Sequence, residues 1–123
     1  MTFDPEPYAE HYRKANEAEA ARISIRAEAA RVEAARVARI ISDSDAAVRR
    51  VILFGSLAKG MPRSEGFDID LALDGGDLYR ALDAAESSEF DIDLVDLQLV
   101  PEHVRARILD EGIVLASSDM PRG

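Results

Sequence analysis

The sequence is 123 residues long, contains no cysteine and carries a formal net charge of −9 at pH 7. This length favours one compact domain, and the missing cysteine excludes a disulfide framework, a zinc–thiolate site and a thiol nucleophile. The acidic excess comes from residues 51–123, because the first 50 residues hold nine acidic and nine basic side chains. So acidic a module repels a nucleic-acid backbone, which argues against direct binding of duplex DNA or RNA.

The N-terminus does not combine a basic region with an apolar run, so the sequence predicts no signal peptide. No apolar stretch approaches the length that crosses a bilayer, so we expect no membrane partner. Together these observations predict a cytoplasmic protein.

The N-terminal third predicts one long helix, from about Tyr8 to Ile41. This stretch is rich in Ala, Glu and Arg, lacks Gly and Pro, and is followed by a break of Ser and Asp at residues 42–45. An Ala-dominated seam buries little area per turn, so the helix needs something to pack on. Two interpretations stay open: a helix lying across its own sheet, or a docking or homo-oligomer surface. The seam follows heptad spacing and consists of Ala20, Ile23, Ala27, Ala30, Ala34, Val37 and Ile41.

The rest of the chain predicts a small sheet with helices. Alternating apolar residues indicate strands at Arg49–Phe54, Asp68–Leu73 and Asp91–Leu97, and a short edge strand at Ile113–Leu115. Helices are expected at Leu57–Gly60, Asp77–Ser87 and Pro101–Glu111, before a polar tail at residues 116–123. This order predicts an α/β (α+β) fold with a small mixed sheet and helices on one face. We divide the chain into an N-terminal helical segment, residues 1–48, and a core with its tail, residues 49–123.

The clearest chemical signal is a pair of acids inside an apolar strand. In Asp68-Ile69-Asp70 the two carboxylates share one face of the strand, while Ile69 points to the core. Neighbouring carboxylates repel each other unless a cation lies between them. Asp91 and Asp93 repeat the pattern on the next strand, so either can add a third carboxylate. Three carboxylates and the oxygens of a triphosphate suit two Mg²⁺ ions.

Other acids are expected to mark only strand ends and solvated faces. This group consists of Asp74, Asp83, Asp96 and Asp119, because they do not form a period-two pair among apolar residues.

A Gly-Ser turn follows the first strand and predicts a phosphate site. Gly55 leaves backbone N–H groups uncovered and Ser56 adds a hydroxyl, which together suit an anion. In the following loop, Lys59 and Arg63 either neutralise phosphate or are ordinary surface charges. A phosphate site beside a metal site is the layout of a phosphoryl-transfer centre.

These motifs together resemble the minimal nucleotidyltransferases (MNT) of the DNA-polymerase-β-like superfamily. The likeness covers about Arg49 to Leu115, and Phe67 departs from it, because many members have Ser directly before the first metal-binding Asp. The resemblance implies that the Gly-Ser pair holds a nucleoside triphosphate and that three acids hold the metals. By this likeness the acids are Asp68, Asp70 and Asp93, since the run Asp93-Leu94-Val95 matches better than Asp91, and the nucleotide site is Gly55 and Ser56, to which we add Lys59.

The resemblance also implies a reaction and a partner. Many minimal nucleotidyltransferases are paired with HEPN-type RNase toxins, and some attach AMP to a toxin. We therefore expect an antitoxin that transfers AMP from ATP to a hydroxyl of a partner protein in a Mg²⁺-dependent reaction. The sequence shows no second module to hold an acceptor, which favours a folded protein as acceptor. The alternatives are a non-catalytic binding antitoxin or scaffold, and a nucleotidyltransferase acting on a small molecule such as an antibiotic.

Overall fold

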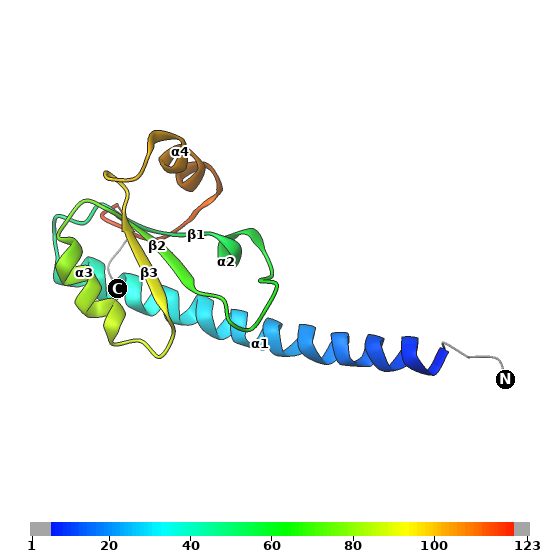
Figure 1. The fold of residues 1–123 in the computed structure, drawn as a ribbon. Coiled ribbons are helices and arrows are strands. Elements are labelled where there is room, and N and C mark those ends of the chain that lie inside the picture. Colours follow the sequence, from blue (N-terminus) through cyan, green and yellow to red (C-terminus); the bar gives the residue numbers. More distant parts are fainter. Residues whose placement is uncertain (1–5, 120–123) are drawn as a thin grey trace.

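The computed structural model describes residues 6–119, which form a four-stranded sheet, three helices packed around it and one short helix at the end of the chain's first strand (Figure 1). The mixed sheet and the long N-terminal helix are as expected, and the element ends differ from the predicted ones by a few residues. The elements in chain order are α1 (Glu6–Ser44), β1 (Arg50–Phe54), α2 (Ser56–Lys59), β2 (Ile69–Asp74), α3 (Leu78–Glu86), β3 (Ile92–Asp96), α4 (Glu102–Glu111) and β4 (Ile113–Ser117).

The helix α1 continues through most of the expected break. Ser42 is buried, and the Ser44 hydroxyl donates to the Ile41 carbonyl at 3.0 Å, so both serines fit a helical end. The chain turns at Asp45, whose carboxylate accepts hydrogen bonds from the backbone N–H groups of Ala47 and Asp77.

The strand order is β3-β2-β1-β4. β1 lies at the centre and pairs antiparallel with both β2 and β4, whereas β2 and β3 are parallel and are connected through α3. The register places Phe54 opposite Asp70 across β1 and β2, and Asp70 opposite Asp93 across β2 and β3.

One face of the sheet packs against α1 and α3. Leu53, Leu71 and Leu94 from three neighbouring strands share a buried cluster with Ala34 of α1 and Ala81 of α3. Alternation along each strand sends these side chains to the same face. Figure 1 shows both helices on this side.

The opposite face carries α4, which corrects the prediction of helices on one face only. A second buried cluster joins Ile52 of β1, Ala72 of β2 and Leu97 to Ile108 of α4. These strand residues alternate with those of the first cluster, so the sheet is apolar on both faces over this part. Ile108 is the buried residue of α4, so the sequence of this helix carries only a weak apolar pattern that would predict it to cover a sheet.

The Ala seam of α1 is core. Ala27, Ala30 and Ala34 have no exposed surface, and small side chains let the helix approach the sheet closely. From Ile23 to Ile41 the interpretation of the seam as a docking or oligomer surface is therefore wrong, because the chain's own sheet occupies it, whereas Ala20 is exposed. Residues 6–22 of α1 are exposed, and Figure 1 shows this part of the helix projecting beyond the sheet. None of the helices within residues 6–119 is both long and apolar enough to cross a bilayer.

Candidate active site

The predicted carboxylates lie at one end of the β2–β3 pair. Asp70 is the second residue of β2 and is paired in parallel register with Asp93, so both side chains leave the sheet on the same face. Neighbouring strands are about 4.8 Å apart, which makes these two carboxylates direct neighbours. Asp68 lies just before β2, and Asp91 just before β3. Alternation puts Asp91 and Asp93 on the same face, and it is the strand register that makes Asp93 the direct neighbour of Asp70.

Two of the neighbouring acids act electrostatically on Asp70. Burial, together with the negative charges of Asp93 and Asp68, raises the pKa of Asp70 to about 6. Asp70 is half-buried, whereas Asp68 and Asp93 are exposed. A carboxylate whose ionised form is disfavoured by neighbouring anions is stabilised by a bound cation.

The Gly-Ser turn touches this cluster directly. Gly55 has a φ of +75°, a conformation that L side chains rarely adopt, and a Cβ built on it would lie 2.2 Å from Asp70 Oδ2. Only glycine leaves room for the carboxylate here. Ser56 follows as the first residue of α2 and is exposed. The anion site and the acidic site predicted from the sequence are therefore adjacent.

Two pockets flank α2. The larger one has a volume of about 480 Å³ and is lined by Ser56, Lys59, Met61, Pro62, Arg63, Ser64 and Phe67. The smaller one has a volume of about 260 Å³ and is lined by Phe54, Gly55, Lys59, Val104, Arg107, Ile108 and Glu111. Because Phe54 is the register partner of Asp70, the smaller pocket opens beside the carboxylates.

Lys59 has a protein partner in this structure. Its Nζ lies 3.0 Å from Glu111 Oε2 on α4, and both side chains are about half exposed. An exposed pair of this kind contributes little to stability, so Lys59 can exchange Glu111 for another anion at small cost. Its assignment to phosphate binding stays a prediction.

The carboxylates of Asp68, Asp70 and Asp93 are suitable ligands for Mg²⁺, although their side chains are not arranged as a complete metal site. Within residues 6–119 no group of three or more His, Asp or Glu side chains stands close enough to hold a metal ion as it is. Three carboxylates offer the oxygen ligands that Mg²⁺ prefers, and this ion keeps several waters and phosphate oxygens as further ligands. The room that Gly55 leaves beside Asp70 Oδ2 is consistent with such an arrangement.

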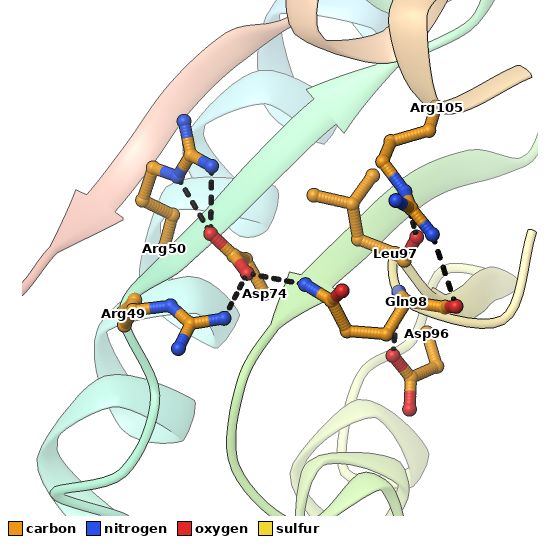
Figure 2. A network of polar contacts seen from close by, with 7 residues as sticks. All are labelled: Arg49, Arg50, Asp74, Asp96, Leu97, Gln98 and Arg105. Carbon is orange, nitrogen blue, oxygen red and sulfur yellow. Dashed lines mark hydrogen bonds and ion pairs between the residues drawn. The ribbon is translucent and has the colours of Figure 1, made fainter. Parts of the chain in front are cut away.

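Asp74 was expected to be a solvated strand end, and this expectation is wrong. Figure 2 shows its buried carboxylate between three donors: Arg49 at 2.8 Å, Arg50 at 2.7 Å and the Gln98 amide at 3.0 Å. Burial raises the pKa of Asp74, but the hydrogen bonds from Arg49 and Arg50 outweigh this effect and hold the pKa below its ordinary value.

This network lies away from the carboxylate cluster. Asp74 is four residues beyond Asp70 on β2, or about 13 Å along a strand. In the same network Arg105 of α4 donates to the carbonyls of Leu97 and Gln98 (Figure 2). The group therefore connects β1, β2 and α4 structurally. Arg49 and Arg50 are adjacent in the sequence, but only the antiparallel register of β1 with β2 brings them to Asp74.

Comparison with known proteins places the chain among related sequences and folds. Residues 36–121 match the family described as Polymerase beta, Nucleotidyltransferase. No curated protein matches the sequence.

Three solved complexes contain a chain with a similar fold. A mutant of the toxin–antitoxin complex MntA–HpeT gives a TM-score of 0.55 at 20% identity, covering 68% of this chain and 72% of that chain. A tri-AMPylated HEPN toxin in complex with MNT antitoxin, from Shewanella oneidensis, gives 0.53 at 21% identity, covering 72% of each chain. The toxin–antitoxin complex MntA–HepT gives 0.52 at 20% identity, covering 71% of this chain and 72% of that chain. At such identities the likeness concerns the fold.

Proposed function

The chain belongs to the polymerase-β nucleotidyltransferase family, and from this premise we propose that it transfers AMP from ATP to a hydroxyl of a partner protein. The observation that carries the proposal is the contact between the Gly-Ser turn and the acidic cluster. A Cβ on Gly55 would lie 2.2 Å from Asp70 Oδ2, so a triphosphate held by the turn would lie beside any cation held by the acids.

Each residue has a chemical task in this proposal. Asp68, Asp70 and Asp93 would hold Mg²⁺, while Gly55 and Ser56 would bind the triphosphate through backbone N–H groups and the hydroxyl. Bound Mg²⁺ supplies charge neutralisation at the phosphates and makes the attacking hydroxyl more acidic. In the reaction the hydroxyl oxygen bonds to the α-phosphorus as the bond to pyrophosphate breaks, and the hydroxyl proton goes to solvent. The register of Asp70 with Asp93 on adjacent strands supports this assignment, because it would keep two of the proposed ligands in fixed relative positions.

We propose a HEPN-type toxin as the acceptor. The solved complexes with a similar fold contain MNT antitoxin or MntA together with a toxin, and one of those toxins carries AMP. The exposed part of α1, residues 6–22, offers a surface beyond the sheet on which a protein partner can dock. This surface lies N-terminal to the buried part of the seam, which begins at Ile23, so docking there leaves the fold intact.

Calorimetry with Mg²⁺ and each of the four nucleoside triphosphates tests the first half of the proposal. We expect Mg²⁺-dependent binding of ATP and loss of that binding in Asp70→Asn and Asp93→Asn. Asp91→Asn, two residues before Asp93 in the chain, is the matched control and should bind ATP nearly as well as wild type. Loss in Asp91→Asn with retention in Asp93→Asn would show that the third carboxylate is misassigned.

Mass spectrometry tests the second half. After incubation with ATP, Mg²⁺ and a HEPN-type toxin, the toxin should gain the mass of AMP, and the Asp70→Asn protein should leave it unmodified. If no nucleoside triphosphate binds at all, the chain is a binding module and not an enzyme. If ATP binds but only a small hydroxylated molecule is modified, the protein acceptor is wrong.

A further inference from the structure

We propose that Arg31 of α1 is a positioning residue for the nucleotide site, because it holds α2 and thereby the Gly-Ser turn in place. This inference rests on the proposed function, since it concerns how the same turn binds a triphosphate. Arg31 is 26 residues before Leu57 in the chain. It is one of several arginines in the Ala-, Glu- and Arg-rich sequence of α1, so the sequence does not single it out.

The contact is made through both ends of one guanidinium. Arg31 Nε donates to the Leu57 carbonyl at 3.3 Å, and Nη2 donates to the Gly60 carbonyl. The last carbonyls of a helix have no partner within it, and in a helix as short as α2 they are a large share of its polar groups. A planar guanidinium can serve two such carbonyls at once, which a lysine ammonium on a flexible stem does poorly.

A movement of α2 necessarily moves the turn. The N–H groups of Ala58 and Lys59 both donate to the Gly55 carbonyl at 3.2 Å, so the turn and the short helix are one hydrogen-bonded unit. Leu57 of α2 is 1% exposed and belongs to the buried apolar cluster, so it anchors the turn and the short helix to the core. Arg31 supplies the polar contact at its far end.

The base that carries Arg31 is rigid. Ala27, Ala30 and Ala34 on the same helix have no exposed surface, so α1 is seated firmly on the sheet at this point. The Arg31 side chain is only 31% exposed, and Glu28 lies 3.8 Å away on the preceding turn of the helix. The guanidinium therefore reaches α2 from a fixed position and with restricted freedom.

A second arginine of α1 supports the same assignment. Arg22 Nε donates to Glu65 Oε1 at 2.8 Å, in the loop that joins α2 to β2. This pair is more exposed than the Arg31 contact, so its contribution is smaller. Arg36, in contrast, bonds to Glu33 within α1 and gives a matched control for the loss of a helical arginine.

Without the guanidinium, α2 keeps its apolar anchor but loses the contact that fixes its end. The Gly-Ser turn then has to become ordered when ATP binds. This cost lowers the affinity of the protein for ATP and for the transition state by the same factor. Such a loss raises KM and leaves kcat unchanged. A purely structural role would lower thermal stability without changing either constant for the folded protein.

The experiment compares Arg31→Gln, Arg31→Lys and the control Arg36→Gln in the full chain. In nucleotide-free protein, Arg31→Gln should speed amide hydrogen exchange at Ala58 and Lys59 about tenfold, which is the size expected for losing hydrogen bonds to a charged group. It should also raise the Kd for Mg-ATP and the KM about tenfold, with kcat within a factor of two and Arg31→Lys intermediate. Arg36→Gln should leave all of these unchanged.

The inference is overturned if wild-type protein binds Mg-ATP and Arg31→Gln changes exchange and affinity no more than Arg36→Gln does. An equal drop in Tm for both variants with normal Mg-ATP affinity also overturns it, because Arg31 would then be a structural residue only. If wild-type protein binds no Mg-ATP, the proposed function fails, and the inference fails with it.

Discussion

Replacing Asp70 by Asn is expected to stabilise the metal-free protein at neutral pH. Burial and the charges of Asp93 and Asp68 raise the pKa of Asp70 from 3.8 to about 6, so the folded chain binds this proton more tightly than the unfolded chain does. The stability linked to this proton is complete below pH 3.8 and is lost as the pH rises through about 6. Asn has no proton to lose, so the variant escapes this loss.

The size of the effect follows from the same shift. A rise of about two pH units corresponds to roughly 3 kcal/mol at 1.36 kcal/mol per unit. Asp70 is half-buried, and solvent screening reduces this figure to about 1.5 kcal/mol. For a chain of this length, that gain raises the Tm by roughly 5 °C.

Thermal unfolding in the presence of a chelator measures it. Asp70→Asn should melt higher than wild type at pH 8 and equally at pH 4, where the folded wild type already carries the proton. Asp83→Asn, an exposed carboxylate on α3, is the control and should change little at either pH. Added Mg²⁺ should stabilise wild type but not Asp70→Asn, since a ligand of the native state alone raises stability by mass action. A lower Tm for Asp70→Asn at pH 8 would refute the reasoning, because the acid would then be a structural partner.

Three further substitutions probe the fold and the turn. Asp74→Ala should lower the free energy of unfolding, measured in urea at pH 7, by about 2–4 kcal/mol, because three donors lose their acceptor. The difference from wild type should shrink at low pH, where Asp74 is protonated. Ala30→Glu should prevent folding as judged by circular dichroism, whereas Ala29→Glu on the exposed side of α1 should fold normally; equal behaviour of the two would contradict the seating of α1. Gly55→Ala should cost about 1–2 kcal/mol and abolish Mg-ATP binding in calorimetry, because its Cβ would collide with Asp70. Gly66→Ala, where a Cβ meets nothing within 4 Å, should leave binding intact, and a normal Gly55→Ala protein would show that the contact with Asp70 does not matter.

Local sequence patterns determined the features that depend on neighbouring residues. The alternation of acid and apolar residues around Ile69 places Asp68 and Asp70 on one side of the chain whatever the strand pairs with. Gly55-Ser56 after a strand predicts a turn, because glycine tolerates the positive φ found there. The Ala seam predicts a helix that packs closely on something.

Tertiary structure decided what these local features meet. The parallel pairing of β2 with β3 selects Asp93 as the neighbour of Asp70, and the seating of α1 converts the seam from a candidate docking surface into core. Asp74 and Arg31 matter through partners 24 to 29 residues away in the chain, which no local pattern can identify. Side-chain period and backbone freedom act within a few residues, whereas burial, strand register and the pKa of Asp70 depend on groups that only folding brings together.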